Sequence, residues 1–241
     1  LIDNFYFLLI IFFLIISLKT FYFIYLILLI YILFHFKRIF FTKKNLNNII
    51  YNKITLLFFI GIFTLLVTNI LNTGCIIYPA SFSCFENLSW SIPKDEVVNM
   101  KIWYELWSKA GATPNFRIED SSLYLSSFNW VNNWFKTYFF TKISDLILII
   151  FIILIIMFFL FKDHNKYDFT LHNKNIYIIT ILLFIQWFVS YPALRYGGYA
   201  VLTLIIFLPF CSFITLNVKN LNIFKKVFSL IIISYCIFIY K

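Results

Sequence analysis

The sequence predicts an all-α fold, a polytopic integral membrane protein with about six to seven transmembrane helices and a helical external loop of about 70 residues. Three observations predict this class. Hydrophobic residues make up 62% of the chain and charged residues only 12%, about half the charge of a soluble domain. The basic residues gather between apolar stretches rather than within them. Four of those stretches lack lysine and arginine and approach the length of a bilayer span, namely 54–72, 146–161, 176–194 and 199–216.

The first 36 residues admit two readings. Residues 5–17 and 21–36 are apolar and are separated only by Leu18, Lys19 and Thr20. They form either a tight helical hairpin or one overlong helix. The hairpin is favoured, because a lysine near the centre of a spanning helix costs about 2.5 to 3.5 kcal/mol.

The two ends of the chain suggest a piece of a longer protein. The sequence begins with Leu1, has no basic start and has no small-residue cleavage site, so we expect no signal peptide. The final apolar stretch, 227–240, is only marginally long enough to span a membrane.

The distribution of charge predicts the topology. Three connecting segments, 37–53, 162–175 and 217–226, are rich in lysine, whereas the long polar segment has equal numbers of basic and acidic residues. The positive-inside rule therefore places the three basic segments in the cytoplasm and the long segment on the external side of the membrane. We expect the lysines to meet membrane lipids through anionic headgroups, and we expect no nucleic-acid partner. The predicted organisation is N-terminal spans in 1–72, an external loop in 73–143 and C-terminal spans in 144–241.

Two amphipathic helices are predicted in the external loop. The first begins near Pro93 and ends at Lys109–Gly111, and its apolar face includes Trp103 and Trp107. The second begins at Asp120–Ser122 and presents Trp130 and Trp134 on its apolar face. Either both helices lie along the outer leaflet, or these four tryptophans form a stacking wall for a sugar or a polyprenyl carrier.

Cys75 and Cys84 lie in the predicted external segment, where an oxidising compartment would allow a disulfide between them. Zinc is the competing idea. The three histidines, His35, His164 and His172, all lie near the predicted cytoplasmic side, so no zinc ligand set is expected. We predict no cofactor, and the need for a divalent metal stays open.

Arg195 is the strongest candidate for chemistry at membrane depth. It lies between two spans in the turn Tyr191–Tyr199, where Pro192 interrupts a helix and Gly197–Gly198 allow a sharp bend. The guanidinium could bind a phosphate or carboxylate through two parallel hydrogen bonds, or it could simply reach the headgroup region. The spans contain no paired carboxylates, and the sequence has no nucleophile triad or glycine-rich phosphate loop.

Several short motifs carry a family resemblance. They are Asn72-Thr73-Gly74-Cys75-Ile76-Ile77-Tyr78-Pro79, Cys84-Phe85, Leu88-Ser89-Trp90-Ser91 and Arg195-Tyr196-Gly197-Gly198. Over roughly residues 54–200 the chain resembles bacterial polytopic envelope-polysaccharide membrane proteins that are similar to GT-C type glycosyltransferases. The resemblance implies a polyprenyl-phosphate-linked sugar donor, with its phosphate near Arg195 and Tyr196 and its glycan in the external loop. In that class the catalytic carboxylate lies in the first external loop, which here would precede Leu1.

The function expected from these features is that of a glycosyltransferase-like membrane protein acting on lipid-linked sugars in cell-envelope polysaccharide synthesis. An O-antigen polymerase-like protein is an alternative, because that class shares a large external loop with an essential arginine. A noncatalytic or transport protein is the other. A transporter needs polar residues through several spans or broken helices in matched halves, and neither pattern is seen.

Overall fold

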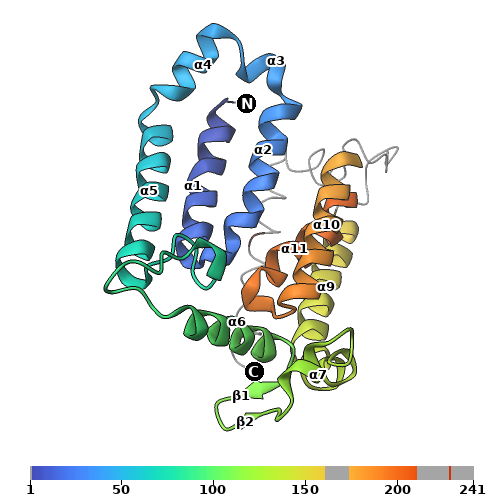
Figure 1. The fold of residues 1–241 in the computed structure, drawn as a ribbon. Helices are drawn as coiled ribbons and strands as arrows, with labels where there is room; N and C mark the ends of the chain where they lie inside the picture. The colour runs from blue at the N-terminus through green and yellow to red at the C-terminus, as the bar shows by residue number, and fades with distance from the viewer. Residues whose placement is uncertain (1, 161–173, 211–227, 229–241) are drawn as a thin grey trace. The chain divides into compact units, whose positions relative to one another are not determined.

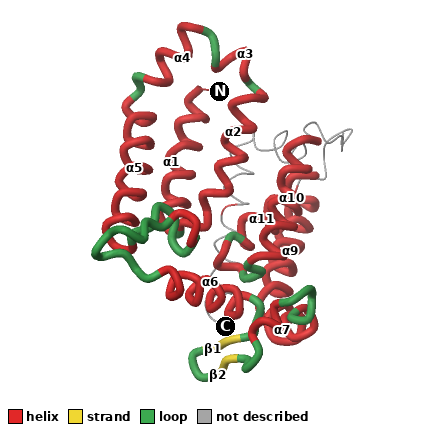
Figure 2. The backbone as a smooth tube through the Cα atoms, viewed as in Figure 1, coloured by secondary structure: helices red, strands yellow, loops and turns green. Residues whose placement is uncertain are grey.

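The computed structural model describes residues 2–160, 174–210 and Phe228, and these residues are mostly helical (Figure 2). The all-α class is therefore confirmed. Two strands of two residues each, β1 (Ala112–Thr113) and β2 (Phe116–Arg117), are present. The chain divides into two compact units, unit 1 (Leu1–Ser108 and Pro114–Ser121) and unit 2 (Lys109–Thr113 and Ser122–Lys241).

Unit 1 begins with a helical hairpin. The first helix ends at Leu18, and Lys19 adopts an extended conformation (φ −158°, ψ 137°) that turns the chain back. The helices on either side of the turn lie next to each other (Figure 1), as the favoured reading of the first 36 residues expects. The helical elements of unit 1 are α1 (Ile2–Leu18), η1 (Thr20–Tyr25), α2 (Leu26–His35), α3 (Lys37–Phe40), α4 (Lys43–Ile50), α5 (Lys53–Thr73), η2 (Ser81–Ser83) and α6 (Lys94–Ser108).

The limits of α5 follow from local chemistry. At its start the Asn52 side chain accepts a hydrogen bond from the Ile54 N–H (2.8 Å), which satisfies one of the unpaired donors of the first turn. At its end Gly74 adopts φ +74°, a left-handed conformation that glycine tolerates best. In between, α5 packs against α1, and Gly61 leaves room for the ring of Phe13. The expected helix over 54–72 is confirmed.

The segment after α5 folds back onto the end of that helix. Cys75 and Cys84 are joined in a disulfide with an S–S distance of 2.05 Å. The Phe85 N–H donates to the Gly74 carbonyl (2.8 Å), and the Trp90 indole N–H donates to the Ile70 carbonyl (3.3 Å). These contacts make the Gly-Cys-x-x-Tyr-Pro motif part of a compact, internally bonded loop.

The described residues of unit 2 form one long helical rod and three further α-helices, α7, α10 and α11. The rod runs without interruption through α8, η3 and α9, and α11 packs against both α9 and α10. The elements are α7 (Ser121–Leu125), α8 (Val131–Trp134), η3 (Phe135–Ile143), α9 (Ser144–Leu160), α10 (Lys174–Ser190), η4 (Leu194–Tyr196), α11 (Gly198–Phe207) and η5 (Leu208–Phe210).

The structure corrects the second amphipathic helix. Instead of one helix from Asp120 through Trp134, α7 ends at Leu125 and a new helix starts at Val131. The break has a side-chain cause, because the Ser126 hydroxyl and the Asn129 amide both donate to the Leu123 carbonyl and so satisfy the end of α7. The first amphipathic helix is confirmed as α6, which ends two residues before Ala110, a left-handed residue with φ 62°.

Among the described residues, two helices are long and apolar enough to cross a membrane, Lys53–Thr73 and Val131–Ile155. Four shorter apolar helices of 10 to 17 residues accompany them, namely Asn4–Leu18, Phe21–His35, Lys174–Ser190 and Gly198–Phe210. By length alone the described residues therefore do not support six to seven spans. Apart from Phe228, the expected span 227–240 lies outside the described residues, as does the end of 199–216.

Candidate functional site at the arginine turn

The turn between α10 and α11, which we call the arginine turn (residues 192–198), buries most of its residues and exposes its arginine. Pro192, Leu194 and Tyr196 are buried, whereas Arg195 is exposed. Gly197 has φ +101°, a left-handed conformation that allows the chain to enter α11 immediately. A single charged side chain is therefore presented on an otherwise packed turn.

Three aromatic side chains of unit 2 hold the backbone of the arginine turn. The indole N–H of Trp134 donates to the Pro192 carbonyl (2.8 Å). The indole N–H of Trp187 donates to the Ala193 carbonyl (3.0 Å). The Leu194 N–H donates to the hydroxyl of Tyr138 (2.9 Å). Each bond pairs a backbone group of the turn that lies outside the regular hydrogen bonding of α10 and α11. Trp134 and Tyr138 belong to the rod and Trp187 belongs to α10, so two elements hold the turn.

The tryptophans that hold the turn lie in the core of unit 2. Trp130, Trp134 and Trp187 are only 1%, 2% and 1% exposed. They pack with Ile143, Leu194 and Leu202. Gly198 makes room for this core, because a Cβ at that position would lie 2.6 Å from Cζ2 of Trp187.

The burial of Trp130 and Trp134 differs from the expected stacking wall. The ring of Trp130 lies under the Lys109 ammonium group (4.9 Å) and beside Phe188 (5.3 Å between ring centroids). The ring of Trp134 stacks on Tyr138, with 6.2 Å between centroids and 22° between planes. Since their faces are covered by protein groups, these two tryptophans leave no open face for a sugar ring.

The exposed guanidinium has aromatic neighbours. Arg195 Cζ lies 5.0 Å from the centroid of the Tyr196 ring. The hydroxyl of Tyr138 interacts electrostatically with Arg195, Tyr196 and Tyr199, and Tyr199 is 51% exposed. A guanidinium with neighbouring hydroxyl groups is a set of donors that suits a phosphate or a carboxylate.

Tyr138 belongs to the π-helical segment η3, in which each turn is wider than in an α-helix. Nearby hydroxyl side chains reach back to carbonyl groups four residues earlier. Thr137 donates to Asn133 O, Thr141 to Thr137 O and Ser144 to Phe140 O, each within 2.7 to 2.8 Å. Such segments recur at functional sites, and here the segment carries the phenol that bonds the arginine turn.

A second hydrogen-bonded network fixes the start of unit 2. The hydroxyl of Tyr124 donates to the Lys109 carbonyl (2.8 Å). The amide of Asn133 donates both to the Ala110 carbonyl (2.9 Å) and to the Tyr124 hydroxyl (3.0 Å). Burial raises the pKa of the Tyr124 phenol, while the hydrogen bond from Asn133 acts in the opposite direction.

Trp103 and Trp107 lie on α6 in unit 1, apart from the core tryptophans of unit 2. Their rings pack edge to face, 5.8 Å between centroids. The Arg117 guanidinium lies over Trp103 at 5.6 Å. Both rings are only half-buried, so of the four predicted tryptophans these two keep accessible surface for a ligand.

The sequence analysis missed Asp145. It is half-buried in the first turn of α9 and lies inside the candidate span Val131–Ile155. The predicted apolar stretch begins at residue 146, directly after this carboxylate, so Asp145 was given no role; an acidic residue next to an apolar stretch was the available signal. Among the described residues, no cluster of three or more histidine, cysteine, aspartate or glutamate side chains could hold a metal ion.

Comparison with known proteins gives one family match. A family model described as a domain of unknown function, DUF8201, matches residues 2–202. No curated protein and no solved structure matches the chain. The match covers the arginine turn, the disulfide loop and both candidate spans.

Proposed function

The chain belongs to the DUF8201 family, and we propose that it is a multi-pass protein of the bacterial inner membrane that binds a lipid-linked sugar through its phosphate at Arg195. The arginine turn carries this proposal. The backbone of this turn is buried and hydrogen-bonded, so the position from which the exposed Arg195 side chain extends is fixed before any ligand arrives, which lowers the entropic cost of binding.

The outward-facing apolar side chains support the membrane location. In α5, Leu57 is 65% and Phe63 is 67% exposed. Only 11% of the apolar window of each candidate span is buried. A core helix of a soluble protein would turn such side chains inward, so lipid is the environment that would cover them.

Six to seven crossings follow if the shorter apolar helices also span. A helix of 13 to 17 residues is about 20 to 25 Å long, and a bilayer can thin locally to match it at modest cost. The crossings would be α1, η1 with α2, α5, the rod from α8 to α9, α10, α11 with η5, and residues 227–240.

The expected topology suits a phosphate ligand. It puts the arginine turn at the external end of α10, near the depth of the lipid headgroups. A polyprenyl-phosphate sugar in the outer leaflet would present its phosphate at that depth. The Arg195 guanidinium would bind two phosphate oxygens through parallel hydrogen bonds.

The reaction class that fits this ligand is sugar transfer of the GT-C type. The Arg195 guanidinium would stabilise the negative charge that develops on the phosphate leaving group. The family resemblance implies that the glycan lies in the external segment 73–143, where aromatic faces would suit a sugar ring. Such a transferase also needs a general base, and Asp145 is the only acidic residue within the two candidate spans.

Arg195→Ala tests the proposal. The purified full chain is titrated with a short polyprenyl-phosphate sugar and with the uncharged polyprenol, and bound lipid is counted by native mass spectrometry. Hydrogen bonds to charged groups contribute about 1.5 to 3 kcal/mol, so the variant should bind the phosphate ligand about 10- to 100-fold more weakly. The affinity of Arg195→Lys for the phosphate ligand should lie between those of the wild type and Arg195→Ala, because lysine keeps the positive charge and lacks the planar guanidinium group.

The matched control is Arg38→Ala, which removes an exposed arginine from unit 1. It should bind the phosphate ligand as the wild type does. In cells, Arg195→Ala should also stop incorporation of sugar into envelope glycan at unchanged protein abundance. Equal phosphate binding by Arg195→Ala and the wild type would refute the proposed role of the turn.

A further inference from the structure

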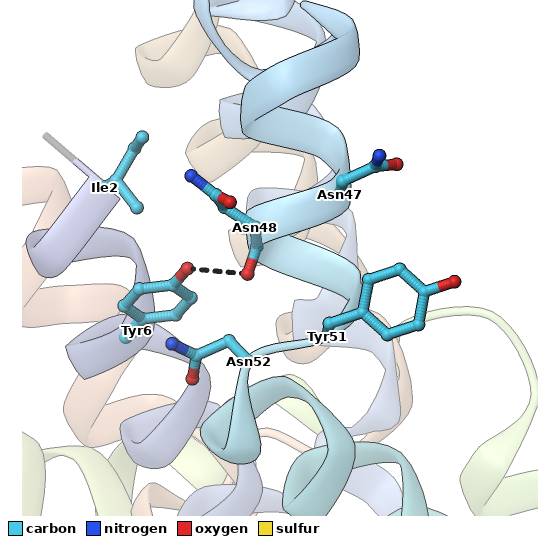
Figure 3. A pocket seen from close by; sticks show the side chains of 6 residues that line it. All are labelled: Ile2, Tyr6, Asn47, Asn48, Tyr51 and Asn52. Carbon is cyan, nitrogen blue, oxygen red and sulfur yellow. Dashed lines mark hydrogen bonds between the residues drawn. The ribbon is translucent and has the colours of Figure 1, made fainter.

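Unit 1 contains an open cavity of about 480 Å³ at the junction of α1, α4 and α5, which we call the amide pocket. In Figure 3, Ile2, Tyr6, Asn48 and Asn52 surround one side of this space. Asn47 and Tyr51 project from the opposite side of α4 in that view. The sequence analysis gave none of these residues a role.

The backbone around the amide pocket is already fixed by hydrogen bonds. The hydroxyl of Tyr6 donates to the Asn48 carbonyl (3.3 Å), which ties α1 to α4. The Asn52 side-chain oxygen accepts the Ile54 N–H, so that side chain is held at the start of α5. Asn48 is an exposed residue, and its side-chain amide lies on the side of α4 that faces this space (Figure 3).

The chemistry of the lining is neutral and rich in hydrogen-bonding groups. Carboxamide and phenol groups both donate and accept, as hydroxyl groups of a ligand require. Lys53 directly follows Asn52 in the sequence and is exposed, so it adds a positive charge at this end of α5. The segment 37–53 contains five basic residues and no acidic one, so an anionic ligand is favoured there.

The location of the pocket limits the ligand further. It lies at the end of two apolar helices, and exposed apolar side chains begin within a turn of it, at Phe7 on α1 and at Leu56 and Leu57 on α5. A ligand with a polar head and long apolar chains would match both surfaces. This step rests on the proposed membrane location and is independent of sugar-phosphate binding at Arg195.

We propose that the amide pocket binds the headgroup of an anionic phospholipid of the cytoplasmic leaflet, with phosphatidylglycerol as the best fit. Its glycerol hydroxyls would bond the side-chain amides of Asn48 and Asn52 and the phenol of Tyr6. Its phosphate would lie toward Lys53, at a site where each basic group near the membrane surface favours anionic lipid. The acyl chains would lie along α1 and α5.

The test uses the full chain in detergent, to which phosphatidylglycerol or phosphatidylcholine is added, with bound lipid counted by native mass spectrometry. The wild type should retain phosphatidylglycerol in preference to phosphatidylcholine. Asn48→Leu should weaken phosphatidylglycerol binding about tenfold, the effect of one lost hydrogen bond to a charged or strongly polar ligand. The control Asn99→Leu changes an exposed asparagine on α6 in the same way and should leave binding unchanged.

Two further variants and a competition experiment distinguish binding at the amide pocket from other modes of lipid binding. Tyr6→Phe removes one hydroxyl and should weaken phosphatidylglycerol binding severalfold. This variant therefore tests the proposal if Asn48→Leu does not fold. Arg195→Ala should bind phosphatidylglycerol normally, which separates this proposal from the proposed function. Competition by soluble glycerol 3-phosphate as strong as that by the lipid, equal retention of both lipids, or wild-type binding by Tyr6→Phe would each overturn the proposal.

Discussion

The indole N–H of Trp134 donates a 2.8 Å hydrogen bond to the carbonyl of Pro192, a residue 58 positions later in the chain. This bond links the start of the rod from α8 to α9 with the turn that presents Arg195. Since Trp134 is buried in the core of unit 2, packing of that core and orientation of the turn depend on the same side chain.

Trp134→Phe should therefore destabilise unit 2. The substitution keeps an aromatic ring in the core and leaves the buried Pro192 carbonyl without its donor, which costs about 1 to 3 kcal/mol. The free energy of unfolding in detergent measures the loss. The control Trp103→Phe removes a half-buried indole and its contact with Arg117, and should cost less than about 1 kcal/mol. Equal losses in the two variants would contradict the structural role of the hydrogen bond.

Tyr124→Phe should change how stability depends on pH. Because burial raises the pKa of Tyr124 above its usual value of 10.0, the neutral phenol is favoured in the folded state. Its contribution is fully present below pH 10 and is lost as the pH rises through the raised folded pKa. The wild type should thus lose stability more steeply than Tyr124→Phe above pH 10, measured by thermal unfolding.

The control for this experiment is Tyr51→Phe, which removes an exposed phenol and should keep the alkaline loss of the wild type. At neutral pH, Tyr124→Phe should be about 0.5 to 1.5 kcal/mol less stable, because it lacks the hydrogen bond to the Lys109 carbonyl. An alkaline loss of stability that is the same with and without the Tyr124 hydroxyl would rule out this titration as its cause.

The disulfide between Cys75 and Cys84 predicts a specific labelling pattern. In a background with Cys211 and Cys236 replaced by serine, the unfolded chain should take up no thiol label before reduction and two labels after it, counted by mass. Replacing both remaining cysteines by serine should lower stability by about 2 to 3 kcal/mol, the chain-entropy effect of so short a loop. Two labels on the unreduced chain would show that the bond does not form.

Elements bounded by local signals could be predicted from the sequence. The expected helix 54–72 matches α5 to within one residue at each end, because Asn52 and Gly74 mark its limits. The helix expected from Pro93 to Lys109 matches α6, because Pro93 and the segment Lys109–Gly111 mark its limits in the sequence. Apolar runs likewise locate α9 and α10, since helix limits there coincide with changes in polarity.

Features that depend on distant contacts could not be predicted. Trp130 and Trp134 have the spacing of an apolar helix face, and the sequence does not reveal that a turn 58 residues away and a neighbouring helix cover them. The break after α7 depends on where the side chains of Ser126 and Asn129 donate. The exposure of Arg195, by contrast, follows from the proline and glycines that surround it.

Cysteine accessibility in intact cells tests the central claim, that this is a multi-pass membrane protein with the arginine turn outside. Single cysteines are introduced as Asn99→Cys on α6, Tyr199→Cys beside the turn and Asn45→Cys on α4, and are exposed to a maleimide that does not cross the inner membrane. The account predicts that positions 99 and 199 react in intact cells and position 45 reacts only after permeabilisation. Labelling of position 45 in intact cells, or of 99 and 199 only after permeabilisation, would contradict it.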